Sequence, residues 1–472
     1  MPTAQLNFGN NLASGDSSLA GASPFAFNVL VDGKGAVRRR PGISAWAGFP
    51  STVPEASQID GISSFQDDVY YVTSTRNIYR VNVGSATAIS LSTGGASTQL
   101  DDFGRPVFAE TAFRLVIAGG GLPQKIDSGA TAAGRLGGSP PRSTQAIALA
   151  SRIFTDDQTD STSQGQIRAS QQGNAGNETF DPLDVVSAEA RPDPIVAMRE
   201  NSNEAYVWGT STLQIFTPDA NTILAPGRAL NRGLAAADSV VFVDEQFAWF
   251  TDLRNFVISD GRSINVISDP IDSTLESITT LSDCWGFRST LDQFDILVWL
   301  FPTDGRSFAY QDNGGWSQWS SWTGTGHGPL VIKSHYLLNR AGTAKTHLVG
   351  LSNGQIAKLD STAGTDLGTP IKAEVSTGFQ SYGNDAYKHA QELLFTFKRG
   401  QSTGSTEPQV LLSWRDDYGD YCTPLRIGLG TTGDNIFTVP LRSLGVFRRR
   451  DWKLEFTDAA DFVLAGAQLT FG

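Results

Sequence analysis

The chain has 472 residues with 49 glycines, 21 prolines and 40% hydrophobic residues, which is long enough for a large core and rich in turns. Its net charge of −12 argues against a general nucleic-acid-binding surface, because duplex affinity comes chiefly from neutralising phosphates. Cys284 and Cys422 lie far apart, supply neither a disulfide framework nor a four-ligand zinc site, and indicate assembly in a reducing compartment. No run approaches the ~20 apolar residues of a membrane span, so we expect no membrane insertion and no export signal.

Residues 1–50 are predicted to be a docking segment that contains a hairpin. The turn lies within residues 32–35, between two short apolar runs, and Pro41-Gly42 makes a second turn directly after Arg38, Arg39 and Arg40. The segment is too apolar for a free tail, with Leu6, Phe8, Phe25, Phe27 and Val29. We therefore expect it to dock on the rest of the chain or on a neighbouring subunit.

Residues 51–370 repeat a short hairpin of apolar and β-branched residues, at intervals of roughly 40 to 50 residues, which is the period of β-propeller blades. The predicted hairpins cover residues 69–81, 112–126, 205–216, 247–258, 296–310 and 347–357. An insert at about 152–191 breaks the spacing, and residues 158–177 within it have few large apolar side chains. We expect this insert to be a long exposed loop that is cut first by proteases.

Residues 371–472 have longer alternating runs and are predicted to form a β-sandwich-like unit. In the alternative interpretation, these strands complete the last blade and add an outer sheet. The predicted fold class is therefore all-β: a β-propeller with an additional C-terminal β-sandwich-like unit.

A tryptophan-rich run follows an Asn-Gly-Gly turn and places Trp316, Trp319 and Trp322 three residues apart. The faces of a strand alternate with period two, so this spacing cannot line one face. The main interpretation is that these rings pack in or between blades. The alternative is an exposed aromatic platform that binds carbohydrate.

Signals for catalysis, metals and cofactors are weak, and we predict no enzyme activity, no catalytic residues, no metal and no cofactor. The four histidines do not fall at metal-ligand spacings, and the sequence contains no nucleophile elbow or phosphate-binding loop. Adjacent acids such as Asp67-Asp68 are more typical of a solvated turn than of a glycosidase pair.

Two basic runs stand out in this acidic chain: Arg38, Arg39 and Arg40, and Arg448, Arg449 and Arg450. Each run falls on a predicted strand, so alternate arginines point to opposite faces and cannot form one patch. Contact with acidic surfaces of neighbouring subunits and contact with DNA phosphate both remain open. We favour subunit contact, because Arg–carboxylate pairs suit interfaces and the net charge opposes DNA binding.

Parts of this pattern resemble the tail hub or nozzle proteins of short-tailed bacteriophages, also called packaged-DNA stabilisation proteins. The resemblance rests on Asn28, Gly35, Val37, Arg39, Arg40, Pro41 and Gly42, on the tryptophan-rich run, and on Gly445, Arg448, Arg449, Leu464, Gly466 and Ala467. It implies a structural virion protein that is assembled in the host cytoplasm.

The implied function is mechanical. By resemblance, the chain forms a homo-oligomeric ring, a hexamer, beneath the portal and adaptor rings. This ring continues the DNA exit channel, retains the packaged genome and anchors tail fibres, spikes or needle proteins. DNA passes through the lumen without specific binding, and we expect an acidic lumen wall, because a basic wall would hold phosphates.

Two other classes stay open on the sequence alone. The first is a carbohydrate-binding or carbohydrate-cleaving propeller used in receptor recognition, which requires the tryptophan platform to be exposed. The second is a cellular propeller scaffold.

Overall fold

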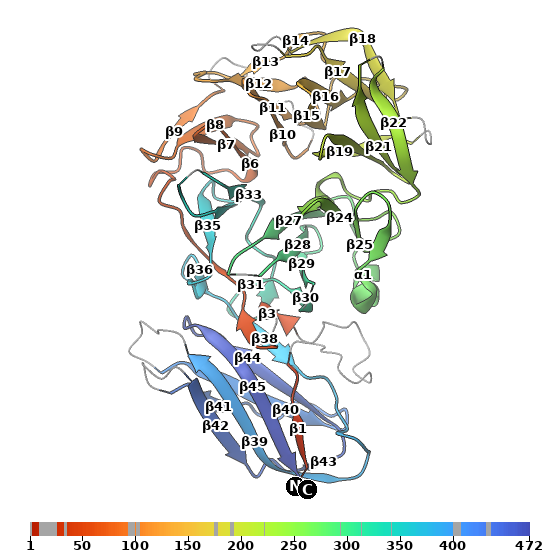
Figure 1. Ribbon diagram of the computed structural model, residues 1–472. Helices are drawn as coiled ribbons and strands as arrows, with labels where there is room; N and C mark the ends of the chain where they lie inside the picture. Colours follow the sequence, from red (N-terminus) through yellow and green to blue (C-terminus); the bar gives the residue numbers. More distant parts are fainter. Residues whose placement is uncertain are drawn as a thin grey trace.

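The computed structural model describes residues 2–8, 26–32, 35–92, 100, 104–173, 178–188, 193–220, 222–292, 294–312, 314–340, 342–399, 407–430 and 436–472. Within these residues the chain forms a ring of small sheets, and a separate strand-rich unit is attached at the rim of the ring (Figure 1). Helical segments are limited there to η1 (Ala237–Ser239), η2 (Asp269–Ile271) and α1 (Asp272–Glu276). No helix in the described residues is long and apolar enough to cross a membrane.

The ring is a β-propeller in which each blade is an antiparallel meander, with its first strand nearest the axis (Figure 1). The first three blades are β6 (Ile59–Phe65), β7 (Asp68–Thr73), β8 (Ile78–Asn82) and β9 (Thr87–Ser90); β10 (Val107–Glu110), β11 (Arg114–Ala118), β12 (Gln124–Asp127) and β13 (Gly134–Arg135); and β15 (Ala146–Leu149), β16 (Arg152–Asp156), β17 (Gln166–Ser170) and β18 (Thr179–Ser187), with β14 (Gly137–Gly138) parallel to β18.

The ring continues in chain order around the axis. The next three blades are β19 (Ile195–Asn201), β20 (Glu204–Gly209), β21 (Leu213–Asp219) and β22 (Ile223–Leu230); β23 (Val241–Val243), β24 (Gln246–Phe250), β25 (Phe256–Ser259) and β26 (Ile264–Val266); and β27 (Trp285–Ser289), β28 (Ile296–Phe301), β29 (Arg306–Gln311) and β30 (Gly315–Gln318). A small hairpin, β31 (Ser321–Trp322) and β32 (His327–Gly328), follows.

The last blade takes its fourth strand from the N-terminal part of the chain. Its strands are β33 (Ser334–Leu338), β34 (Thr346–Gly350), β35 (Ile356–Asp360) and β5 (Gly42–Ala45), extended by β36 (Thr365–Asp366) and β37 (Thr369–Pro370). β5 pairs antiparallel with β35, with Ile43 opposite Leu359. Seven blades are therefore present in the described part of the chain, and a strand from near the start of the chain closes the last one.

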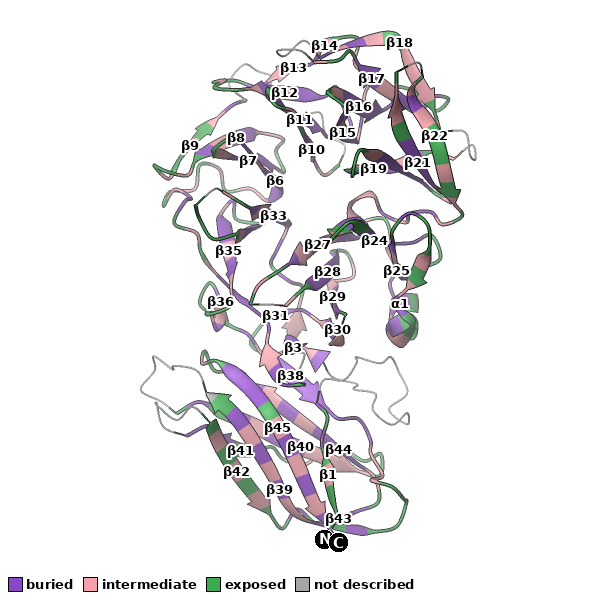
Figure 2. Cartoon of the chain, in the orientation of Figure 1, coloured by how far each residue is buried: buried purple, intermediate pink, exposed green. Residues whose placement is uncertain are grey.

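Many residues of the blade strands are buried (Figure 2). Apolar clusters between neighbouring blades hold the ring together. All six residues of β28 are buried, because both faces of this strand are covered by neighbouring blades. Trp208 of one blade packs edge-on against Trp249 of the next, with ring centroids 5.7 Å apart. Such pairs add about 1 kcal/mol to the burial of the rings themselves.

The C-terminal unit has two packed sheets. One contains β3 (Val29–Val31), β4 (Val37–Arg39), β45 (Phe462–Phe471), β39 (Lys388–Arg399) and β42 (Ile436–Arg442), with β1 (Thr3–Gln5) on β45 and β43 (Val446–Phe447) on β39. The other contains β38 (Ala373–Ser376), β44 (Arg450–Phe456), β40 (Gln409–Asp416) and β41 (Leu425–Gly428). Phe395 and Trp452, both 0% exposed, belong to the core of this unit. The predicted all-β propeller with a sandwich-like C-terminal unit is confirmed.

One short strand, β2 (Ala26–Phe27), joins the two units. Phe27 pairs with Gln318 at the outer edge of a blade and with Glu374 of β38. The sheet is therefore continuous from the blade into the sandwich. This continuity retains one element of the alternative interpretation, in which the C-terminal strands extend a blade.

The prediction of a long loop at 152–191 is wrong for most of that range. β16, β17 and β18 form the outer strands of a complete blade there, and residues 174–177 and 189–192 lie outside the described residues. Phe154, Ile167 and Ala169 are 0% exposed in its core. A blade needs only a few apolar residues at alternate positions. Because the rest of this segment is rich in serine and glutamine, its composition does not indicate strands.

Candidate functional site at the junction of the propeller and the C-terminal unit

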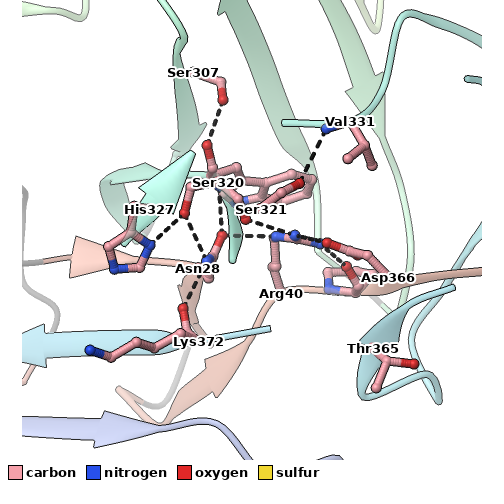
Figure 3. Close-up of polar contacts among 12 residues, drawn as sticks. Asn28, Arg40, Ser307, Ser320, Ser321, His327, Val331, Thr365, Asp366 and Lys372 are labelled. Carbon is pink, nitrogen blue, oxygen red and sulfur yellow. Dashed lines mark hydrogen bonds and ion pairs between the residues drawn. The ribbon is translucent and has the colours of Figure 1, made fainter. Parts of the chain in front are cut away.

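A buried ion pair lies where the N-terminal segment meets the last blade (Figure 3). Arg40 follows β4 and is 1% exposed; its Nη2 lies 2.6 Å from Oδ2 of Asp366 in β36, and its Nη1 lies 3.0 Å from Oδ1. The guanidinium also donates to the carbonyl oxygens of Pro41 and Ser320. If either Arg40 or Asp366 is replaced by an uncharged residue, the charge of the other remains buried without its partner.

Asn28 connects three parts of the chain through one side chain. Its Oδ1 accepts from Nε of Arg40 and from the backbone N–H of Ser320, both at 2.8 Å. Its Nδ2 donates to the carbonyl oxygen of Lys372, at 2.8 Å, and to Oγ of Ser320, at 3.0 Å. The residue is 0% exposed and has a left-handed backbone with φ of 57°, which asparagine tolerates better than most residues.

A charged cluster covers the β38–β44 side of the same junction. Nζ of Lys372 lies 2.5 Å from Oε1 of Glu374 and 2.9 Å from Oε2 of Glu455, and Lys453 contacts both glutamates. Burial raises the pKa of Glu374, but the contacts with His327 and Lys372 and the positive charges of Lys372 and Lys453 outweigh it and lower the pKa to about 2. The ring of His327 stacks on Phe27 of β2, with centroids 4.2 Å apart.

The basic run at the start of the chain is divided between different environments. The guanidinium of Arg39 donates to the carbonyl oxygens of Asp458 and Ala460, and burial lowers its pKa to about 10. Arg38 is partly exposed and lies over the ring of Phe294. The subunit-contact prediction does not hold for Arg40, because its guanidinium is buried within its own chain.

The second basic run is divided in the same way. Arg450 is 1% exposed and pairs with Asp416 through two contacts of 2.5 and 2.7 Å, so the subunit-contact prediction does not hold for it either. Arg449 pairs with Asp385 on the surface, and Arg448 stacks over Tyr387 at 4.8 Å. For Arg38, Arg39, Arg448 and Arg449, subunit contact stays a prediction.

The tryptophans of the run at 316–322 do not form a surface platform. Trp316 and Trp319 are each 1% exposed, and Nε1 of Trp316 donates to the carbonyl oxygen of Ile267 in the neighbouring blade. Trp322 is partly exposed and is covered by Lys372, whose Nζ lies 4.7 Å from the ring centroid. The carbohydrate platform therefore lacks the exposed rings that it requires.

A cavity of about 630 Å³ lies on the propeller axis and is lined by the inner strand of every described blade. Its charged groups include Arg105, Arg199 and Asp238, none of which the sequence analysis singled out. Within the described residues, no group of three or more His, Cys, Asp or Glu side chains could hold a metal ion.

Comparison with known proteins gives one match to a family. Residues 144–363 match the family described as "Phage_stabilise: Bacteriophage P22 Gp10, beta-propeller". This match confirms the resemblance that the sequence indicated. The matched residues include the tryptophan-rich run and most blades, whereas Asn28, Arg40 and the C-terminal sandwich lie outside them. No curated protein matches the chain.

Solved structures resemble the chain only loosely. YCF48 from Cyanidioschyzon merolae is 11% identical and covers 66% of this chain and 97% of its own, with a TM-score of 0.42. A structure of YCF48 bound to D1 peptide is 12% identical and covers 68% of this chain and 97% of its own, also with a TM-score of 0.42. BamB from Moraxella catarrhalis is 10% identical and covers 76% of this chain and 97% of its own, with a TM-score of 0.40.

Sequence reasoning found part of the junction and missed part of it. Asn28 and Arg40 were singled out through the family resemblance, but Asp366, Ser320 and Glu374 were not. These partners lie 280 or more residues away along the chain, for example 326 residues between Arg40 and Asp366. The only local signal was an isolated Asp in a Thr-Asp-Leu-Gly turn.

Proposed function

We propose that this protein is a structural subunit of a short bacteriophage tail. The match of residues 144–363 to the phage stabilisation family supports this proposal most strongly. In this proposal the subunit forms a closed ring, a hexamer, beneath the portal and adaptor rings of the virion. The ring continues the DNA exit channel, retains the genome and anchors fibres, spikes or a needle, and it makes or breaks no covalent bond.

The junction favours a mechanical function. Three parts of the chain meet at Asn28, and their polar groups are buried and mutually hydrogen-bonded. Networks of this kind specify one arrangement of the packed units, because any displacement leaves buried donors or acceptors unpaired. A subunit that transmits force between an adaptor and a fibre requires such a fixed connection.

The acidic composition favours a lumen that repels DNA. With a net charge of −12, the chain has an excess of carboxylates for a channel wall. A negative wall keeps the duplex centred and lets it slide, while salt screening over about 10 Å limits the effect to the lumen. Retention before ejection then comes from a constriction or a plug.

Electron microscopy of the purified protein, alone and mixed with its adaptor ring, tests the proposal. We expect closed rings with a central pore that bind coaxially to the adaptor. Particles that remain monomeric in the presence of the adaptor would contradict the ring, and glycan binding without ring formation would favour the receptor-recognition alternative.

A further inference from the structure

The axial cavity of the propeller is polarised along its length. At the end where inner strands begin, its lining includes Arg105 and Asp238. Arg199 lies within β19, but its guanidinium donates to Oε1 of Gln145 and to the carbonyl oxygen of Ala237, which precede β15 and β23. Glu110 lies at the opposite end, because it is the last residue of β10 and follows Arg105 by five residues, about 16 Å at the usual rise of a strand. Glu200 lines the cavity near the C-terminal end of β19. The two guanidinium groups therefore belong to the end of the cavity farther from Glu110.

Both guanidinium groups are held in place by the protein itself. Arg105 donates to the carbonyl oxygen of Lys333 and lies over the ring of Trp285, at 4.4 Å from its centroid. Arg199 donates through Nη1 to Oε1 of Gln145, at 2.8 Å, and to the carbonyl oxygen of Met198, at 2.7 Å. These contacts use only part of the five donors of each guanidinium, so each group is positioned before any ligand arrives.

Asp238 lies close enough to both arginines for each to lower the pKa of its carboxyl, although burial raises that pKa more. In the described part of the chain, however, its carboxylate makes no hydrogen bond and has no cation within 4 Å. The nearby carboxylate of Asp60 already contacts Arg76 and Gln58. Arg105, Arg199 and Asp238 are each half-buried, and as a group they have two positive charges against one negative charge, which favours a bound anion over a bound cation.

We propose that Arg105, Arg199 and Asp238 form a binding site for a protonated phosphate group, either free phosphate or the terminal group of a phosphomonoester. The two guanidiniums donate to phosphate oxygens, and the carboxylate of Asp238 accepts the phosphate O–H. No covalent step is involved. Glu110, Glu200 and Asp60 make the rest of the cavity wall negative, so a doubly charged anion without an O–H is disfavoured.

The proposal makes a specific prediction about selectivity. Sulfate has the same shape as phosphate and accepts equally well from arginine, but it has no O–H at neutral pH. Its oxygens would therefore face the carboxylate of Asp238 without a hydrogen bond. The hydrogen bond from the phosphate O–H to this carboxylate should give about a ten- to hundredfold preference for phosphate over sulfate.

Isothermal titration of the full chain with inorganic phosphate, glycerol phosphate and sulfate tests the site. We expect saturable binding of phosphate and at least about tenfold weaker binding of sulfate. Binding of glycerol phosphate as tight as that of phosphate would identify the terminal group of a monoester as the ligand, and its absence would restrict the site to the free ion. No saturation below about 10 mM phosphate, or equal affinity for sulfate, would overturn the proposal.

Matched variants locate the binding. Arg199→Gln and Arg105→Gln should each weaken phosphate binding at least about tenfold, whereas Arg262→Gln, which changes an exposed arginine on a blade hairpin, should not. Asp238→Asn should raise the affinity for sulfate and reduce the preference for phosphate, because an amide can donate as well as accept. An unchanged preference in Asp238→Asn would contradict the role of the carboxylate. The comparison of phosphate with sulfate on the unmodified chain tests the site even where a variant fails to fold.

Discussion

Oδ1 of Asn28 accepts a hydrogen bond from Nε of Arg40 at 2.8 Å, and both side chains are at most 1% exposed. Asn28 bonds to Ser320 of the propeller and to the carbonyl oxygen of Lys372, directly before β38. Through its contact with Arg40 it also orients the guanidinium that pairs with Asp366. The N-terminal segment is therefore an internal connection of the subunit.

The Asn28 amide should contribute strongly to stability. Asn28→Ala removes four hydrogen bonds and leaves buried groups of Ser320, Arg40 and Lys372 unpaired, so we expect unfolding to become easier by about 3 to 5 kcal/mol. Asn28→Gly keeps the left-handed backbone accessible and separates the backbone effect from the loss of the amide. Denaturant unfolding measures both, with Asn265→Ala on an exposed strand as the control. Equal stability of Asn28→Ala and the control would contradict the connecting role.

The pair between Arg40 and Asp366 should couple much more strongly than an exposed pair. Arg40→Met or Asp366→Asn alone should cost about 3 to 5 kcal/mol, because each leaves one charge buried without its partner. The exposed pair of Arg442 and Glu392, where the arginine side chain is 75% exposed, should contribute less than about 1 kcal/mol. Double-mutant cycles on both pairs measure the difference, and similar coupling energies would show that the junction is not effectively desolvated.

Closure of the last blade by β5 should depend on Gly42. A Cβ at this position would meet the carbonyl oxygens of Thr365 and Ala363, the latter at 2.6 Å. We expect Gly42→Ala to expose the last blade to limited proteolysis, whereas Gly134→Ala, where a Cβ has open space, should be neutral. Deletion of residues 1–42 should accordingly destabilise the subunit itself. A truncated chain with normal protease resistance would contradict closure by this segment.

The histidine pair beside the cavity should make stability fall at acidic pH. The backbone N–H of Thr290 donates to Nε2 of His347, so His347 carries its proton on Nδ1 and donates to Nε2 of His335 at 3.0 Å. Burial lowers the pKa of His347 to about 4, and burial together with His347 lowers the pKa of His335 well below its usual value. The unfolded chain therefore binds more protons below pH ~6.5, and stability is lost as the pH falls from there to about 4.

Thermal unfolding at a series of pH values measures this effect. The loss should approach about 1.4 kcal/mol per pH unit for each histidine within that window. His347→Gln should reduce the slope, whereas His389→Gln at an exposed position should not. An identical slope in both variants would assign the acid sensitivity to other groups.

The sequence predicted the middle of most blades because their central strands are continuous apolar runs joined by short turns. Ile296–Leu300 and Ser307–Tyr310 fall within β28 and β29 for this reason. The blade at 146–187 was missed, since its inward-facing residues are few and separated by polar ones. The pairing of β5 with β35 was also missed, because it joins segments more than 300 residues apart and has no local pattern. The same applies to the partners of Arg40 and to the cavity group around Asp238.

An asymmetric cryo-electron microscopy reconstruction of the virion tests the proposed tail role most directly. The account predicts density for the propeller and its attached sandwich in a ring directly below the adaptor, around the DNA path, with Asp and Glu outnumbering Lys and Arg at the lumen surface. Absence of this fold from the ring below the adaptor, or a lumen in which Lys and Arg predominate, would contradict it.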